Sequence, residues 1–105
     1  MDDEIIGISR LTLDALKPRE VYITDLALAL GELKGIENVD IHVTEVDAKT
    51  ETLKITLTGK GISMEEVEEL LEKYSTVIRS IDAVRVSKFN VEGGLPYEEP
   101  WILYF

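Results

Sequence analysis

Four carboxylates next to the ends of predicted strands are the strongest candidates for chemistry in this chain: Asp14, Glu45, Asp47 and Glu51. In an antiparallel sheet with strand order 4-1-3-2, the ends of the first and second strands meet the start of the third, so we expect these side chains to lie together. Carboxylate oxygens are the preferred ligands of Ca²⁺ and Mg²⁺. The sequence therefore predicts a divalent-cation site, with solvated surface acids as the alternative because the spacing differs from an EF-hand loop.

His42 is the only histidine of the chain, and the alternation places it on the polar face of a strand. General acid–base catalysis by His42 would need an aligned partner and a substrate pocket. The alternative is a surface or interface residue. The same polar face carries Arg10, Lys54 and Arg79, which are suited to a small anion or to the acidic side chains of another subunit.

Several kinds of function lack the residues that they need. There is no cysteine, and the formal net charge of −10 repels nucleic-acid phosphates. The central strands carry no aromatic residues for base stacking. No glycine-rich phosphate loop or serine nucleophile motif occurs. We therefore expect no catalytic residues, no bound organic cofactor and no nucleic-acid partner.

No run of about 18 apolar residues is present, and the acidic start of the chain lacks the basic region of a signal peptide. We therefore expect a cytoplasmic protein that does not enter membranes.

The elements that position these residues follow from hydrophobic periodicity. Alternating strands are predicted over residues 7–16, 39–46, 51–59 and 77–87, and helices over 24–34 and 64–74. This order predicts an α+β fold, a ferredoxin-like βαββαβ two-layer sandwich with an antiparallel sheet of order 4-1-3-2. The chain is expected to be one domain over residues 1–88, followed by a C-terminal tail over 89–105.

Helix-capping residues and a break in alternation add local detail. Thr24 is the predicted N-cap of the first helix, and Gly35 is its predicted stop. Ser63 and Glu66 form a capping box for the second helix. The alternation of the last strand breaks near Asp82, which predicts a β-bulge.

A predicted subunit contact combines the first helix with the tail. Leu28 and Gly31 lie off the apolar stripe of that helix, whose apolar circumference indicates cover on a second side. The tail holds five of the seven aromatic residues and ends in Trp101, Ile102, Leu103, Tyr104 and Phe105. Such a segment packs either on its own domain or on a neighbouring subunit, and we favour the neighbour.

Several segments in this order resemble an archaeal family of unknown function: 13–18, 35–39, 45–47, 51–56 and 80–84. Together they are similar to the archaeal domain-of-unknown-function 211 family over about residues 7–87. The resemblance implies a ferredoxin-like fold and homo-oligomeric assembly, and it implies no established activity. The aromatic tail is longer than the family pattern.

Two functions are consistent with these features. The first is a non-enzymatic, self-assembling domain, a homo-oligomer whose contacts come from the first helix and the tail. The alternative is a regulatory module that binds a small ligand or a divalent cation.

Overall fold

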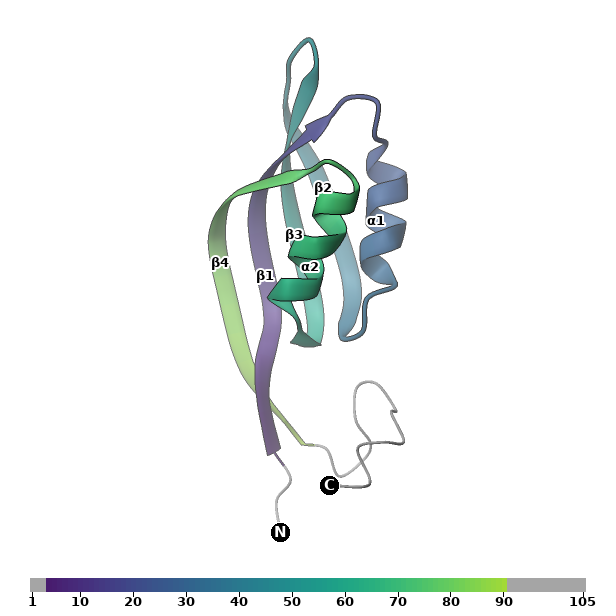
Figure 1. Ribbon diagram of the computed structural model, residues 1–105. Coiled ribbons are helices and arrows are strands. Elements are labelled where there is room, and N and C mark those ends of the chain that lie inside the picture. Colours follow the sequence, from purple (N-terminus) through teal and green to yellow (C-terminus); the bar gives the residue numbers. More distant parts are fainter. Residues whose placement is uncertain (1–3, 91–105) are drawn as a thin grey trace.

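The computed structural model describes residues 4–90, and these form a single sheet with two helices (Figure 1). The elements in chain order are β1 (Glu4–Pro18), α1 (Ile23–Gly31), β2 (Ile36–Val46), β3 (Thr50–Ile62), α2 (Met64–Lys73) and β4 (Val77–Asn90). This is the predicted βαββαβ order. The predicted aromatic tail lies outside the described residues beyond Asn90.

All strand pairs of the sheet are antiparallel, and the strand order is β2-β3-β1-β4. Read from the other edge this is 4-1-3-2, so β1 and β3 are central and β2 and β4 are the edge strands. Both helices lie on one face of the sheet (Figure 1). The fold is α+β and consistent with a ferredoxin-like sandwich. Neither helix in residues 4–90 has the length and apolarity to cross a membrane.

The core lies between the helices and the face of the sheet that they cover, here called the inner face. Residues directly opposite on antiparallel strands share a face, so Leu11 and Leu13 of β1 lie beside Leu57 and Ile55 of β3. The fully buried apolar side chains are Leu11, Leu13, Ala15, Leu26, Leu30, Leu53, Ile55, Leu57, Val67 and Leu71. Each of the larger ones contributes about 1.5–3 kcal/mol of hydrophobic free energy on burial.

Ser63 is confirmed as the N-cap of α2, whereas the predicted cap of α1 is wrong. The backbone N–H of Glu66 donates to Ser63 Oγ at 3.2 Å. In α1 the N-cap is Tyr22, which has extended backbone and makes no side-chain capping bond. The Tyr22 carbonyl already accepts the Leu26 N–H at 3.1 Å, so the helix begins before Thr24.

Helix α1 also ends earlier than predicted, at Gly31. The next turn is tighter, because the Leu33 N–H donates to the Leu30 carbonyl at 3.1 Å. Gly35 then has a φ of +88°, and a Cβ there would lie 2.6 Å from the Lys60 carbonyl oxygen. Gly35 therefore ends this turn directly before β2, at a position that only glycine fits without strain.

Strand β4 carries the predicted bulge and a second one. Thr12 pairs with Ala83 and Leu13 with Ile81, so Asp82 is the extra residue. Arg79 is skipped in the same way further along β4. The strand continues through Phe89 and Asn90, so residue 88, the predicted domain boundary, lies inside β4.

Candidate functional site

The face of the sheet opposite the helices, here called the outer face, is a polar surface built by strand register. One row crosses all four strands and consists of Ser80, Asp14, Lys54 and His42. Within this row Asp14 and Lys54 are directly opposite and carry opposite charges, which favours the sheet by a few tenths of a kcal/mol. The register therefore gathers polar side chains from distant parts of the sequence.

The two bulges of β4 add Arg79 and Asp82 to this surface. Arg79 Nη2 lies 3.4 Å from Asp14 Oδ2, and Ser80 Oγ donates to Asp82 Oδ1 at 2.7 Å. Asp14, Arg79 and Asp82 border an open hollow of about 390 Å³ that Glu45 and Lys54 also line. The hollow is therefore lined by both positively and negatively charged side chains.

The four carboxylates predicted to hold a cation do not form one cluster. Asp14 and Glu45 line the hollow on the outer face. Glu51 instead lies opposite Lys17, with which it forms an ion pair, and Asp47 lies in the exposed turn between β2 and β3. Within residues 4–90 no group of three acidic or histidine side chains is placed to hold a metal ion. The cation site stays a prediction, and the geometry of the described residues adds no ligand set to it.

His42 is exposed on the edge strand β2 and lies directly opposite Lys54. A cationic neighbour does not orient an imidazole as a general base, a role that requires a hydrogen-bond acceptor behind the ring. The structure thus gives His42 the surroundings of a surface residue.

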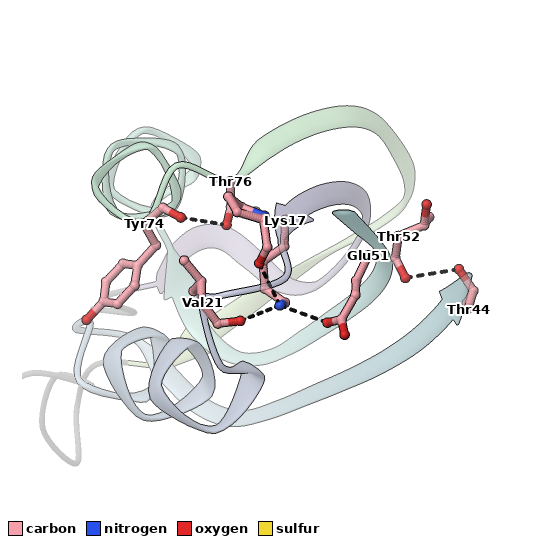
Figure 2. Close-up of polar contacts among 8 residues, drawn as sticks. Lys17, Val21, Thr44, Glu51, Thr52, Tyr74 and Thr76 are labelled. Carbon is pink, nitrogen blue, oxygen red and sulfur yellow. Dashed lines mark hydrogen bonds and ion pairs between the residues drawn. The ribbon is translucent and has the colours of Figure 1, made fainter. Parts of the chain in front are cut away.

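Lys17 is a site residue that sequence reasoning missed. It is 1% exposed, and its ammonium group donates to the Pro18 carbonyl at 2.9 Å and to the Val21 carbonyl (Figure 2). Its third partner is Glu51 Oε1 at 2.8 Å. The three N–H donors are therefore satisfied as a buried charge requires.

The signal for Lys17 is present in the sequence. Leu11, Leu13 and Ala15 alternate inward, and continuing that period by one step places Lys17 on the inner face. The predicted strand stopped at Leu16 because of Pro18, whereas β1 runs through Pro18 at its end. Lys17 and Glu51 also border a second hollow of about 420 Å³ beside the start of α1.

The predicted contact residues of α1 are both on the surface. Leu28 is 72% exposed, and Gly31 is exposed at the end of the helix. The other predicted contact residues, Trp101, Ile102, Leu103, Tyr104 and Phe105, lie outside the described residues.

Apolar side chains on the inner face, along the β4 edge of the sheet, form a surface that was not predicted. Ile81 lies opposite Leu13, Val84 opposite Leu11 and Val86 opposite Ile8, so all three belong to the inner face. The bulges bring them there, because Ile81 and Val84 are three residues apart and would otherwise face opposite sides. With Ile6 they form the open apolar face, in which each side chain is more than half exposed.

The open apolar face is exposed because the helices do not reach it. Figure 1 shows α1 and α2 over the other strands while β4 forms the outlying edge. Ile78, nearer the end of α2, is partly buried against the core, whereas Ile81 is 53% exposed. An exposed apolar strip on an edge strand is typical of an interaction surface.

Comparisons with known proteins give a family but no activity. The family model DUF211, described as "Uncharacterized ArCR", matches residues 9–94. The uncharacterized protein MJ0319 of Methanocaldococcus jannaschii is 43% identical over 86 residues, which cover 82% of this chain and 89% of that protein.

Proposed function

Because the chain belongs to the domain-of-unknown-function 211 family, for which no activity is described, we propose that it is a non-enzymatic domain that acts by self-assembly. The observation that carries this proposal is the open apolar face, formed by Ile6, Ile81, Val84 and Val86. Burying apolar surface contributes about 25 cal/mol per Å². A second copy of the chain could bury this face, so that no different protein would be required.

The backbone of β4 supports the same proposal. Among residues 4–90 the strand that pairs with β4 is β1, so over residues 77–89 one side of β4 presents N–H and C=O groups that no other described strand takes up. Apolar side chains beside an unpaired backbone edge are suited to the addition of a strand from another chain.

Helix α1 and the tail remain the other proposed contacts. The 72% exposure of Leu28 is compatible with a subunit contact there. Trp101 and the residues after it keep their predicted role, which is tested by truncating the chain after Asn90. That cut leaves β4 whole, so a fall in oligomer size would be assigned to the tail.

The experiment that tests self-assembly is native mass spectrometry of the full chain over a range of protein concentrations. A defined oligomer supports the proposal. A monomer at every concentration contradicts it.

The hollow of the outer face favours a second candidate, a regulatory module for a small ligand. Asp14 and Arg79 with Glu45 and Lys54 offer both signs of charge within one depression of about 390 Å³. This arrangement is suited to a small zwitterion such as an amino acid. A ligand that binds the folded chain raises its melting temperature, so thermal shifts with amino acids, nucleotides and divalent ions test it. A response lost in Arg79→Ala would support this site, and no response across the panel would contradict it.

A further inference from the structure

The two edge strands carry opposite charge. β4 contains Arg79, Arg85 and Lys88 against the single acid Asp82, a formal charge of +2. β2 contains Glu37, Asp40 and Glu45 and no lysine or arginine, a formal charge of −3 with His42 neutral. The basic edge stands out in a chain whose net charge is −10.

The basic edge contains two arginines that lie side by side. Arg85 is directly opposite Arg10 on β1, and both are exposed. Within residues 4–90 neither of these two arginines forms an ion pair with an acidic side chain. The arginine that does so there is Arg79, which pairs with Asp14. Like charges directly opposite each other destabilise a sheet. An acidic partner at this edge would remove that cost.

The strand directions allow the two edges to join. β1 and β2 are both antiparallel to β3, and β4 is antiparallel to β1, so β4 and β2 run in opposite directions. A second copy placed in the same orientation therefore continues the sheet with its β2 antiparallel to β4 of the first copy. The helices of both copies then lie on the same side.

The bulges restrict where such pairing is regular. In β4 every residue from Ala83 to Asn90 has a partner on β1, and the register shift within this stretch comes from an extra residue on β1, Ser9. In β2 the residues from Asn38 to Val43 pair with β3 without a shift. Arg85 and Lys88 lie in the regular part of β4, and Asp40 lies in the regular part of β2. The charges that would meet thus belong to the stretches able to pair.

Helix α1 gives a further reason for this pairing. It packs over β2, where a Cβ on Gly31 would be 3.9 Å from Val39 Cγ2. When β2 of one copy lies beside β4 of another, α1 comes next to the open apolar face. The helix cover that Ile81, Val84 and Val86 lack among residues 4–90 is then supplied by the neighbour.

We propose that copies of this chain associate head to tail, with the acidic β2 edge of one copy on the basic β4 edge of the next. This inference rests on the proposed self-assembly and specifies its surfaces. Such a contact joins two different patches, so the assembly is a closed ring or an open filament rather than a two-fold dimer.

Charge reversal at each edge tests the pairing, using sedimentation velocity on the full chain. Arg85→Glu and Asp40→Arg should each weaken association about tenfold or more, because like charges then face each other. The double variant carries both changes, restores opposite charges across the contact and should recover association. Lys73→Glu and Glu68→Arg are matched controls at exposed positions on α2, away from both edges, and circular dichroism melts confirm that each variant is folded.

The outcomes separate the two proposals. Loss in both single variants with recovery in the double variant supports the head-to-tail contact. If Asp40→Arg associates like the wild type, or the double variant does not recover, the head-to-tail contact is wrong while self-assembly stands. A wild-type chain that stays monomeric overturns both.

Discussion

Ile81 lies directly opposite Leu13 on the same face of the sheet, yet Leu13 is fully buried and Ile81 is 53% exposed. The helix layer therefore ends between β1 and β4. A pair of neighbouring apolar residues in such different surroundings marks the limit of the helix layer within residues 4–90.

This boundary predicts different costs for truncating the two side chains. Leu13→Ala should lower the free energy of unfolding by about 2–5 kcal/mol, because it leaves a cavity in the core. Ile81→Ala should cost about 1 kcal/mol or less in dilute protein, as expected for an exposed position. Urea denaturation measures both, and equal costs would show that the open apolar face is covered within the chain.

The buried ion pair between Lys17 and Glu51 predicts an asymmetric response to mutation. Glu51→Ala leaves an ammonium group that is 1% exposed without its counter-ion, and should cost about 3 kcal/mol. Replacing both residues, as Lys17→Met with Glu51→Leu, should recover part of that loss because no unpaired charge remains.

Urea denaturation of the single and double variants checks this response. A Glu51→Ala variant as stable as the wild type would show that the Lys17 ammonium group does not depend on Glu51 for compensation of its charge.

The two helix starts predict contrasting effects of removing a hydroxyl. Ser63→Ala should destabilise the chain by about 1 kcal/mol, since Ser63 Oγ accepts the Glu66 N–H. Thr24→Ala should change stability by less than about 0.5 kcal/mol, because α1 begins before Thr24. Thermal melts of both variants decide the matter, and a larger loss in Thr24→Ala would contradict the observed start of α1.

Two glycines of the connection between α1 and β2 should respond in opposite directions to alanine. At Gly35 the φ of +88° and the nearby Lys60 carbonyl exclude a Cβ, so Gly35→Ala should cost more than about 2 kcal/mol. At Gly31 no atom within 3.9 Å opposes a Cβ, so Gly31→Ala should gain up to about 1 kcal/mol of helix stability. Stabilisation by Gly35→Ala would contradict the turn described.

The element order could be predicted because the signals are local. Alternation in 51–59, the Ser63 capping box and the break at Asp82 each depend on residues close in sequence. The strand order 4-1-3-2 came from the fold that this element order indicates, and the structure agrees.

The parts that could not be predicted depend on register and on the limits of the helix layer. Asp14 and Glu51 were expected together because both lie near one end of the sheet, but register places Glu51 opposite Lys17 on the inner face. The exposure of Ile81, Val84 and Val86 depends on how far the helices extend over the sheet, which no local pattern encodes. Their apolar character alone indicated a buried strand.

The open apolar face makes a direct prediction for association. Replacing Ile81 and Val84 with threonine keeps β-branched side chains suited to a strand but removes apolar surface. Val77→Thr is a matched control, because Val77 is 60% exposed on the same strand but pairs with Leu16 on the outer face.

Sedimentation velocity of these variants beside the wild type is the measurement that tests the central claim most directly. Self-assembly through the open apolar face predicts an oligomer for the wild type and for Val77→Thr, and a smaller species for the Ile81→Thr and Val84→Thr double variant. An oligomer of unchanged size in the double variant, or a monomeric wild type, would contradict it.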